Sequence, residues 1–154
     1  MHIKQLFSRT TDKNGIVFLG INTQVAQEAL CAMSYLGDEK YNATFVAFSF
    51  DIQKKPITIT ASSKTYKASA KTKKYTVTIK TEKCNSNDGK VYLSAGKKIT
   101  MKINGKTYTA KTNDKGQATF SLSITKKGKF SSTIKFAGDK TYASASKSVK
   151  ITIK

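Results

Sequence analysis

The side chains that most often carry out catalysis are scarce in this chain. The single histidine is His2, next to the terminus, and the 154 residues contain two cysteines and nine carboxylates. A histidine-based triad needs an imidazole held between a nucleophile and a carboxylate, and an ordinary zinc site takes several histidine or cysteine ligands. We therefore expect no catalytic residue, no metal-binding residue and no cofactor, and predict that the protein is not an enzyme.

Four aspartates recur at turn-like positions: Asp12, Asp38, Asp114 and Asp139. An aspartate in a turn accepts a hydrogen bond from the backbone N–H two residues further on, and we predict this role for all four. The alternative is a calcium site at a boundary between modules, because calcium favours clusters of oxygen ligands. No acidic cluster in the sequence supports that alternative.

Lysine dominates the charged residues, and the formal net charge is +19. Residues 1–53 contain four basic residues against five acidic ones, so residues 54–154 hold 24 lysines against four acids, a net charge of +20. A charge of this size attracts polyanions such as nucleic acid, acidic wall polymers and membrane head groups. Sequence-specific nucleic-acid binding is the least favoured, because Arg9 is the sole arginine and base-edge recognition favours the guanidinium group.

An internal repeat organises the chain. Residues 35–44 (YLGDEKYNAT) match residues 136–145 (FAGDKTYASA) at a shift of 101, and residues 10–21 match residues 111–122 at the same shift if Asn14 is treated as a one-residue insertion. Repeats at a fixed period take precedence over other interpretations. We predict two domains: residues 1–53 as the C-terminal half of one repeat, and residues 54–154 as a complete repeat.

Apolar residues alternate with polar ones in seven short runs of the complete repeat. This period of two predicts strands with one solvated face. The runs begin at Ile57, Tyr75, Ile99, Tyr108, Ala118, Phe130 and Val149. Seven antiparallel runs without helical segments predict an all-β, immunoglobulin-like antiparallel β-sandwich.

Lysines alternate with the apolar residues in several runs, and we expect them on the outer faces. Four of them are possible polyanion contacts: Lys80, Lys102, Lys135 and Lys150. The alternative is a solvated, solubilising surface with no dedicated partner.

Two shorter segments carry specific predictions. Asn104-Gly105 between two alternating runs is a strong hairpin signal, because both turn residues must adopt positive φ. Residues 22–33 have the local pattern of a helix, but their repeat partner is a turn followed by a strand. We predict a strand over residues 29–36 and keep the helix as the alternative.

Cys31 and Cys84 lie at positions that do not correspond in the repeat, because Cys31 aligns with Ser132. A disulfide shared by every repeat is therefore excluded. We expect two free thiols, and the alternative is a bridge between the two segments, which requires Cα atoms within about 7 Å.

Residues 54–154 resemble the lysine- and threonine-rich Ig-like repeats found in tandem in large adhesin-like surface proteins of methanogenic archaea. The most specific parts of the resemblance are NGKTYTAKTNDKG (104–116) and FAGDKTYASA (136–145). It implies a non-catalytic Ig-like module displayed at the cell surface, outside the cell, as a structural stalk or an adhesion domain. Anionic cell-wall or host polymers and other cell-surface proteins are the partners that fit this role.

An intracellular protein that binds polyanions without sequence specificity is the alternative function. It is suggested by the charge and by the first residues, which lack the apolar core of a signal peptide. The sequence also has no run of 18 apolar residues, so no membrane span is predicted.

The half repeat carries a further expectation. Its strands have an apolar face without the opposing strands of a sandwich, and large bare apolar patches are rare in soluble monomers. We expect this face to pair with a second copy in a homodimer; contact with the complete domain and an exposed face are the alternatives. The face comprises Val17, Leu19, Ile21, Tyr35, Phe48, Phe50 and Ile52.

Overall fold

The computed structural model describes residues 6–20, 25–82 and 91–154, which form strands and turns without a helix. The strands are β1 (Gln27–Tyr35), β2 (Thr44–Ile52), β3 (Ile57–Thr60), β4 (Lys64–Tyr66), β5 (Lys73–Thr81), β6 (Lys98–Ile103), β7 (Lys106–Lys111), β8 (Gln117–Leu122), β9 (Gly128–Phe136) and β10 (Ala145–Ile153). Within these residues, nothing has the length and apolar character of a membrane-spanning helix.

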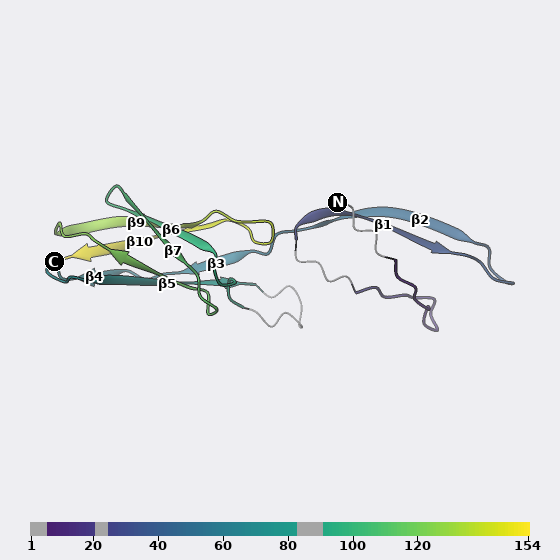
Figure 1. Cartoon of the computed structure of the whole chain (residues 1–154). Helices are drawn as coiled ribbons and strands as arrows, with labels where there is room; N and C mark the ends of the chain where they lie inside the picture. The colour runs from purple at the N-terminus through teal and green to yellow at the C-terminus, as the bar shows by residue number, and fades with distance from the viewer. Residues whose placement is uncertain (1–5, 21–24, 83–90) are drawn as a thin grey trace.

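Strands β3 to β10 form a two-layer sandwich (Figure 1). One sheet has the order β4-β10-β9-β6-β7 and the other the order β3-β5-β8. Alternate residues of both sheets fill the interior, where Phe120, Ile134 and Ile151 are buried. Two stacked, largely antiparallel sheets around one core are the architecture of an immunoglobulin-like sandwich, so the predicted fold class is confirmed.

One strand of the sandwich was not expected. The first alternating run ends at Thr60, and the chain then crosses to the other sheet, where β4 pairs in parallel with β10. The prediction of seven antiparallel runs is therefore wrong at this point: the described residues of the sandwich form eight strands, one of them parallel to its neighbour. This pairing depends on the distant C-terminal strand, so the local pattern of Lys64–Tyr66 does not indicate it.

The predicted hairpin turn is present between β6 and β7. Asn104 and Gly105 have φ angles of 48° and 73°, and Ile103 pairs with Lys106. Two successive residues with positive φ are typical of a type I′ turn, whose twist matches that of the flanking strands.

The N-terminal part of the chain contains a two-stranded antiparallel sheet, β1-β2. The predicted strand over residues 29–36 is confirmed, because β1 pairs with β2 along its whole length. The helical alternative is wrong for the described residues from 25 onward, while residues 22–24 lie outside them. Cross-strand pairing with β2 overrides the local helical pattern.

The hairpin β1-β2 has the same register as β9-β10, shifted by 101 residues. Gln27 pairs with Ile52 as Gly128 pairs with Ile153, 101 residues further on. Lys55 belongs to the sandwich side of the junction, because it bridges to Tyr142. The shift found in the sequence thus reappears in the backbone pairing.

The earlier turn matches without an insertion, contrary to the prediction. Asp12 accepts hydrogen bonds through Oδ1 from the N–H groups two and four residues further on, at 2.8 and 2.9 Å. Asn113 makes the same two bonds at 3.0 and 2.9 Å. Asn113, and not Asp114, is therefore the counterpart of Asp12, because the amide oxygen of asparagine accepts these bonds as a carboxylate oxygen does.

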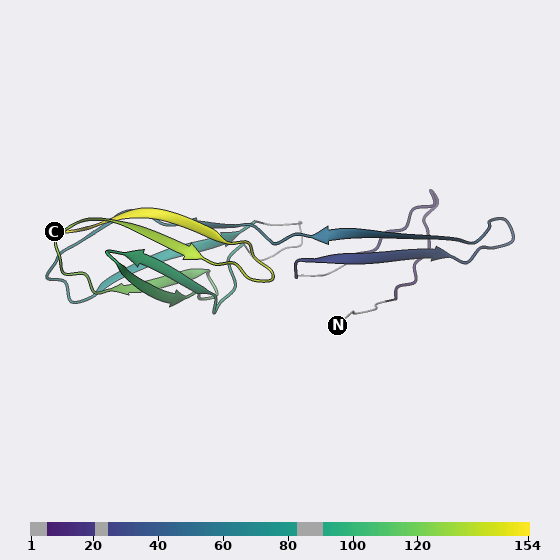
Figure 2. The ribbon, with the colours of Figure 1, turned by 90° about the horizontal axis from the view of Figure 1, so that it is seen from above.

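The hairpin and the sandwich lie end to end (Figures 1 and 2). At the junction, the backbone N–H of Ala26 donates to the carbonyl of Lys140 at 3.0 Å, and the N–H of Lys55 donates to the carbonyl of Thr141 at 2.8 Å. The loop between β9 and β10 is therefore bonded to chain segments on both sides of the junction.

Candidate functional site

The outer face of the five-stranded sheet, called here the broad face, is made of lysine, serine and threonine. The buried residues of its strands alternate with these outward residues. The broad face comprises Thr65 of β4, Ser146, Ser148, Lys150 and Thr152 of β10, Lys129, Ser131, Thr133 and Lys135 of β9, Lys98, Thr100 and Lys102 of β6, and Thr107, Thr109 and Lys111 of β7. Such a face offers ammonium groups and hydroxyls, and no carboxylate.

The outer face of the three-stranded sheet, called here the narrow face, has nearly the same chemistry. It comprises Thr58 and Thr60 of β3, Lys74, Thr76, Thr78 and Lys80 of β5, and Gln117, Thr119 and Ser121 of β8. The hydroxyls of Thr76 and Thr119 lie 2.8 Å apart across β5 and β8. This face also lacks a carboxylate.

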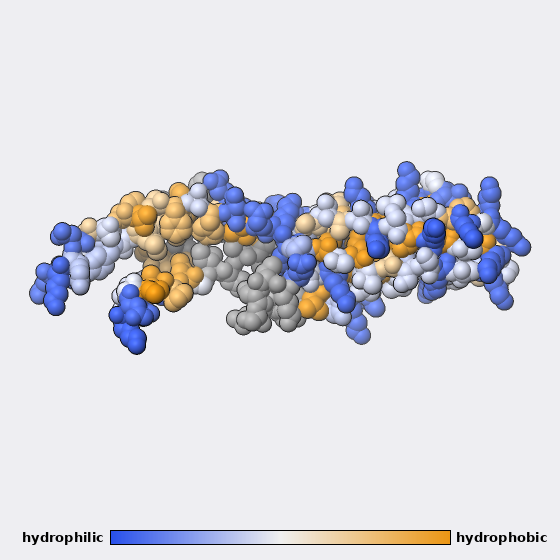
Figure 3. All heavy atoms as spheres, turned by 180° about the vertical axis from the view of Figure 1, so that it is seen from behind, coloured by the Kyte–Doolittle hydropathy of each residue, from blue (hydrophilic) through white to orange (hydrophobic). Residues whose placement is uncertain are grey.

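The carboxylates of the sandwich lie in turns and strand ends instead. In the described residues they are Glu82 after β5, Asp114 between β7 and β8, and Asp139 between β9 and β10. The Asp139 carboxylate is 2.6 Å from the ammonium of Lys97. Since neither outer face contains an acid, its lysines keep a positive field that an external polyanion can neutralise. Figure 3 shows hydrophilic side chains projecting along the sandwich.

The four lysines named from the sequence are all exposed, but they do not share one face. Lys102, Lys135 and Lys150 lie on the broad face, whereas Lys80 lies on the narrow face. Lys102 pairs with Thr133, two residues from Lys135 on β9. Such diagonal neighbours are about 7–8 Å apart in a sheet, so Lys102 and Lys135 can contact neighbouring charges of one polymer. Lys80 cannot join them.

One lysine in the described part of the sandwich is buried. Lys73 at the start of β5 is only 2% exposed, and its ammonium donates to the carbonyls of Ala68 and Ala70 at 3.1 and 2.6 Å. Lys73 has the same phase along β5 as the buried Tyr75 and Val77, so its side chain points inward. A buried ammonium needs hydrogen-bond acceptors, and the loop preceding β5 supplies them.

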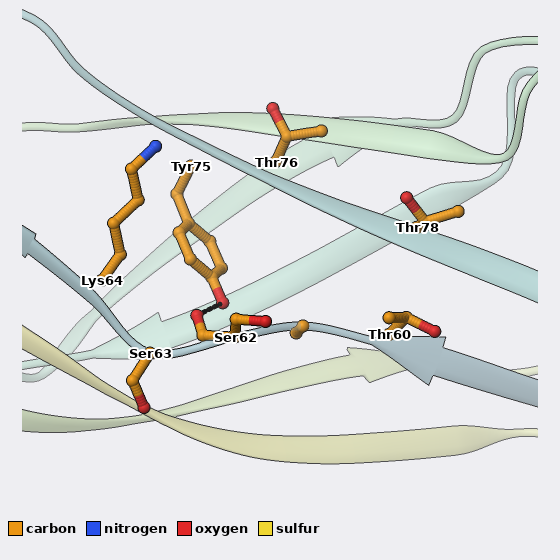
Figure 4. Close-up of a pocket in the computed structure, with 8 residues that line it drawn as sticks. Thr60, Ser62, Ser63, Lys64, Tyr75, Thr76 and Thr78 are labelled. Carbon is orange, nitrogen blue, oxygen red and sulfur yellow. Dashed lines mark hydrogen bonds between the residues drawn. The ribbon is translucent and has the colours of Figure 1, made fainter.

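The narrow face contains a shallow depression of about 290 Å³ at the crossover from β3 to β4 (Figure 4). Hydroxyls of Ser62, Ser63, Thr76 and Thr78 surround it, and the Tyr75 hydroxyl donates to the carbonyl of Ser62 at 2.6 Å. Burial raises the pKa of Tyr75, so its hydroxyl stays protonated at neutral pH. The depression can hydrogen-bond a polar ligand, but its residues do not form a catalytic arrangement.

A second hollow of about 510 Å³ adjoins it and brings Lys80 close to functional groups that the sequence did not single out. Lys115, Tyr92 and Gln117 line it together with Thr60 and Thr78. Tyr92 is 37% exposed, and the tight turn at Gly116 packs against it. An exposed ring, two ammoniums and several hydrogen-bonding groups suit an anionic polymer that has flat or ring-shaped units.

Asp38 and Asp139 have the predicted role of turn aspartates that accept backbone hydrogen bonds. Each accepts bonds through Oδ1 from the N–H groups two and three residues further on, at 2.8–2.9 Å. Burial opposes ionisation of Asp139, but hydrogen bonds from Lys97 and the backbone together lower its pKa. Across residues 6–20, 25–82 and 91–154, no three histidine, cysteine or acidic side chains gather as metal ligands would.

Cys31 on β1 is a free thiol, as expected. Cys84 lies outside the described residues.

Comparisons with known proteins identify no family for this chain. No protein-family model matches the chain, and no curated protein matches it. Among solved structures, the chain is similar to one described as a Ca²⁺-stabilised adhesin with which an Antarctic bacterium reaches out and binds ice. The sequence identity is 15% and the TM-score 0.37, over 84% of this chain and 32% of that one. The chain thus spans about a third of that structure's length.

Proposed function

We propose that this chain is a non-catalytic Ig-like module of a cell-surface adhesin-like protein, which serves as a structural stalk or a contact domain. The resemblance of residues 54–154 to the repeats of archaeal adhesin-like proteins supports this role, and so does the β-sandwich. An adhesin is also what the distantly similar bacterial structure is described as. In this proposal the module lies outside the cell.

The observation that carries a contact role is the absence of carboxylates from both outer faces, on a segment with a net charge of +20. The polymers that such faces attract are anionic, with phosphate, sulfate or carboxylate groups spaced along a chain. We assign the main contact to Lys102, Lys135 and Lys150 on the broad face, with Lys80 in the hollow of the narrow face as a separate point.

Binding to a soluble polyuronate tests this assignment. Replacing Lys102, Lys135 and Lys150 together by glutamine should weaken binding about tenfold at 0.15 M salt, because three contacts and their counterion release are lost. The matched control replaces Lys13, Lys40 and Lys54 by glutamine, the same change in charge away from both faces. A loss of equal size in the control would show that the broad face has no special role.

The second candidate function is non-specific binding of nucleic acid inside the cell, which the net charge favours on its own. Binding to duplex DNA and to polyuronate should be compared over a range of salt concentrations. The surface role predicts that DNA binding is lost by about 0.3 M salt, since the contacts are single lysine charges. DNA binding that survives this salt while polyuronate binding does not would favour the intracellular role.

A further inference from the structure

The hairpin β1-β2 has the same pairing register as β9-β10, but no second sheet of the described residues packs against it. In the sandwich, the inner face of β9-β10 is covered by the opposite sheet, so Ile134 is fully buried and Val149 is 7% exposed. The residues at the same places in the hairpin are Met33 and Phe48, and they are 48% and 42% exposed. The hairpin therefore has the inner face of a sandwich without the second layer.

Exposed apolar side chains are concentrated in this part of the molecule. Figure 3 shows hydrophobic residues gathered over the hairpin and the segment that runs beside it. The large exposed ones are Leu6, Phe7, Ile16, Val17, Phe18, Leu19, Val25, Leu30, Met33, Tyr35, Leu36, Tyr41, Phe45, Val46 and Phe48, whereas Tyr92 is the one in the described part of the sandwich. Met33, Val46 and Phe48 lie on the inner face of the hairpin, whereas Leu30 and Phe45 lie on its opposite face. An exposed apolar face of this kind marks an interaction site.

Among the described residues, no strand forms a second layer over this face. The sandwich lies beyond the end of the hairpin in both views (Figures 1 and 2). Residues 16–20 correspond to the start of β8, but they form no strand, and Val17 and Leu19 remain more than a third exposed. No strand among the described residues therefore supplies a second layer over this face.

We propose that the occupant is the hairpin of a second copy, packed face to face around a two-fold axis. Two hairpins would then form the two layers of a small sandwich, with Met33, Phe48 and Phe50 of both copies in its interior. The charge distribution favours this partner: residues 1–53 have a net charge of −1, so two hairpins can approach each other, while the +20 segments lie at opposite ends of the dimer. A partner that offered its sandwich would present a lysine-coated face instead.

The size of the face sets the expected affinity. Nine paired positions make the hairpin about 30 Å long, and two strands with their side chains are roughly 15 Å wide. The total buried area is then roughly 900 Å², below the range of about 1,200–2,000 Å² for standard stable interfaces and typical of a weak one. We expect a dissociation constant of about 10–100 μM.

Sedimentation of the full chain over a range of concentrations tests the proposal, and 0.5 M salt should screen the +20 segments. The chain is expected to pass from monomer to dimer between about 1 μM and about 1 mM. Phe48→Lys on the apolar face should weaken the dimer at least about tenfold. Ser49→Lys, the next residue on the opposite face, introduces the same charge and should leave the dimer intact.

Cys31 gives a second measurement that does not depend on a disruptive variant. It pairs with Phe48 on the apolar face, so its reaction with a bulky maleimide in the Cys84→Ser background should slow as the dimer forms. Ser34→Cys in a chain without the native cysteines places a thiol on the opposite face, where the rate should stay constant.

Three results would overturn the proposal. They are a monomer at every concentration, a dimer that Phe48→Lys does not weaken, and a Cys31 reaction rate independent of concentration. A peptide of residues 54–111 carries β3 and β5 of the sheet that faces β9-β10 in the sandwich. If the chain stays monomeric and binds this peptide, the occupant is a different one and the proposal is also overturned. None of these measurements involves a polyanion, so their outcome is separate from that of the proposed function.

Discussion

Ser132 is a polar residue at a position where the sandwich needs an apolar one. It lies on β9 between Phe130 and Ile134, is 1% exposed, and its hydroxyl has no hydrogen-bond partner in the described structure. A buried hydroxyl without a partner is unfavourable because it loses its bonds to water. At the matching position in the hairpin the chain has Cys31, whose thiol is only a weak hydrogen-bond donor and loses less when it has no partner.

We predict that Ser132→Ala raises the free energy of unfolding of the sandwich by about 1 kcal/mol, since it removes an unsatisfied hydroxyl. Urea unfolding measures the change. Ser131→Ala on the exposed broad face is the matched control and should have almost no effect. A loss of stability in Ser132→Ala would mean that the hydroxyl has a partner, such as an ordered water.

Asp139 belongs to a small polar cluster that holds the loop between β9 and β10. Its carboxylate pairs with Lys97, whose ammonium also lies 5.5 Å from the centre of the Tyr142 ring, and the Tyr142 hydroxyl is 3.1 Å from that of Ser94. The pKa of Asp139 is lowered in the folded protein. A lowered pKa means that ionised Asp139 stabilises the fold above the pKa of the unfolded chain, about 3.9.

This stabilisation should disappear as the pH falls from about 4 through the folded pKa of Asp139. We expect Asp139→Asn to lower the free energy of unfolding by about 1 kcal/mol at pH 6 and to have less effect at pH 2. Urea unfolding at both pH values measures this. Asp114→Asn removes the same charge at an exposed turn, and a similar pH dependence there would contradict the assignment to Asp139.

At the scale of the elements, two turns require glycine for different reasons. Gly105 at the β6-β7 turn has a φ of 73° and no atom near the place of a Cβ. Gly116 has a φ of 64°, and a Cβ there would lie 2.4 Å from the carbonyl oxygen of Ile79 and 3.0 Å from Cβ of Tyr92. The first turn needs only the backbone conformation, whereas the second also packs directly on its neighbours.

We predict that Gly105→Ala costs about 1–2 kcal/mol of stability, from backbone strain alone. Gly116→Ala should cost at least about 2 kcal/mol more, because the backbone of β5 must also move. The two variants serve as controls for each other in urea unfolding. Equal costs would show that the neighbours of Gly116 adjust freely.

At the scale of the whole molecule, charge opposes the compact state of the sandwich. Its segment carries 24 lysines against four acids, so the folded domain repels itself, and salt screens that repulsion. The lysines on the two outer faces have no carboxylate on the same face, which also discourages sheet edges from pairing with other chains.

Stability should therefore rise with ionic strength. We expect the melting temperature of the sandwich to increase by about 5 °C between 0.05 and 0.5 M sodium chloride, equivalent to about 1 kcal/mol. The variant with glutamine at Lys102, Lys135 and Lys150 should melt higher at low salt and respond less to added salt. A wild-type melting temperature that falls with salt would contradict this explanation.

Several features of the fold were predictable because they depend on near neighbours in the chain. The positive φ values of Asn104 and Gly105 follow from the turn residues themselves, and the alternating runs around Phe120 and Ile151 follow from the pleat of a strand. The exposure of Lys102 follows from the same alternation. The division of the chain at residue 53 remains a prediction, as does the role of the four lysines in binding.

By itself, the sequence determined seven strands of the sandwich, their buried side, the 101-residue shift and the separation of charge between the two segments, because period, turn chemistry and composition are local properties. Only the tertiary structure decided which strands become neighbours. It placed β4 parallel to β10, buried the ammonium of Lys73, paired Lys97 with an aspartate 42 residues away, and left the hairpin without a second layer. These outcomes depend on contacts between distant segments, which a pattern of adjacent residues does not encode.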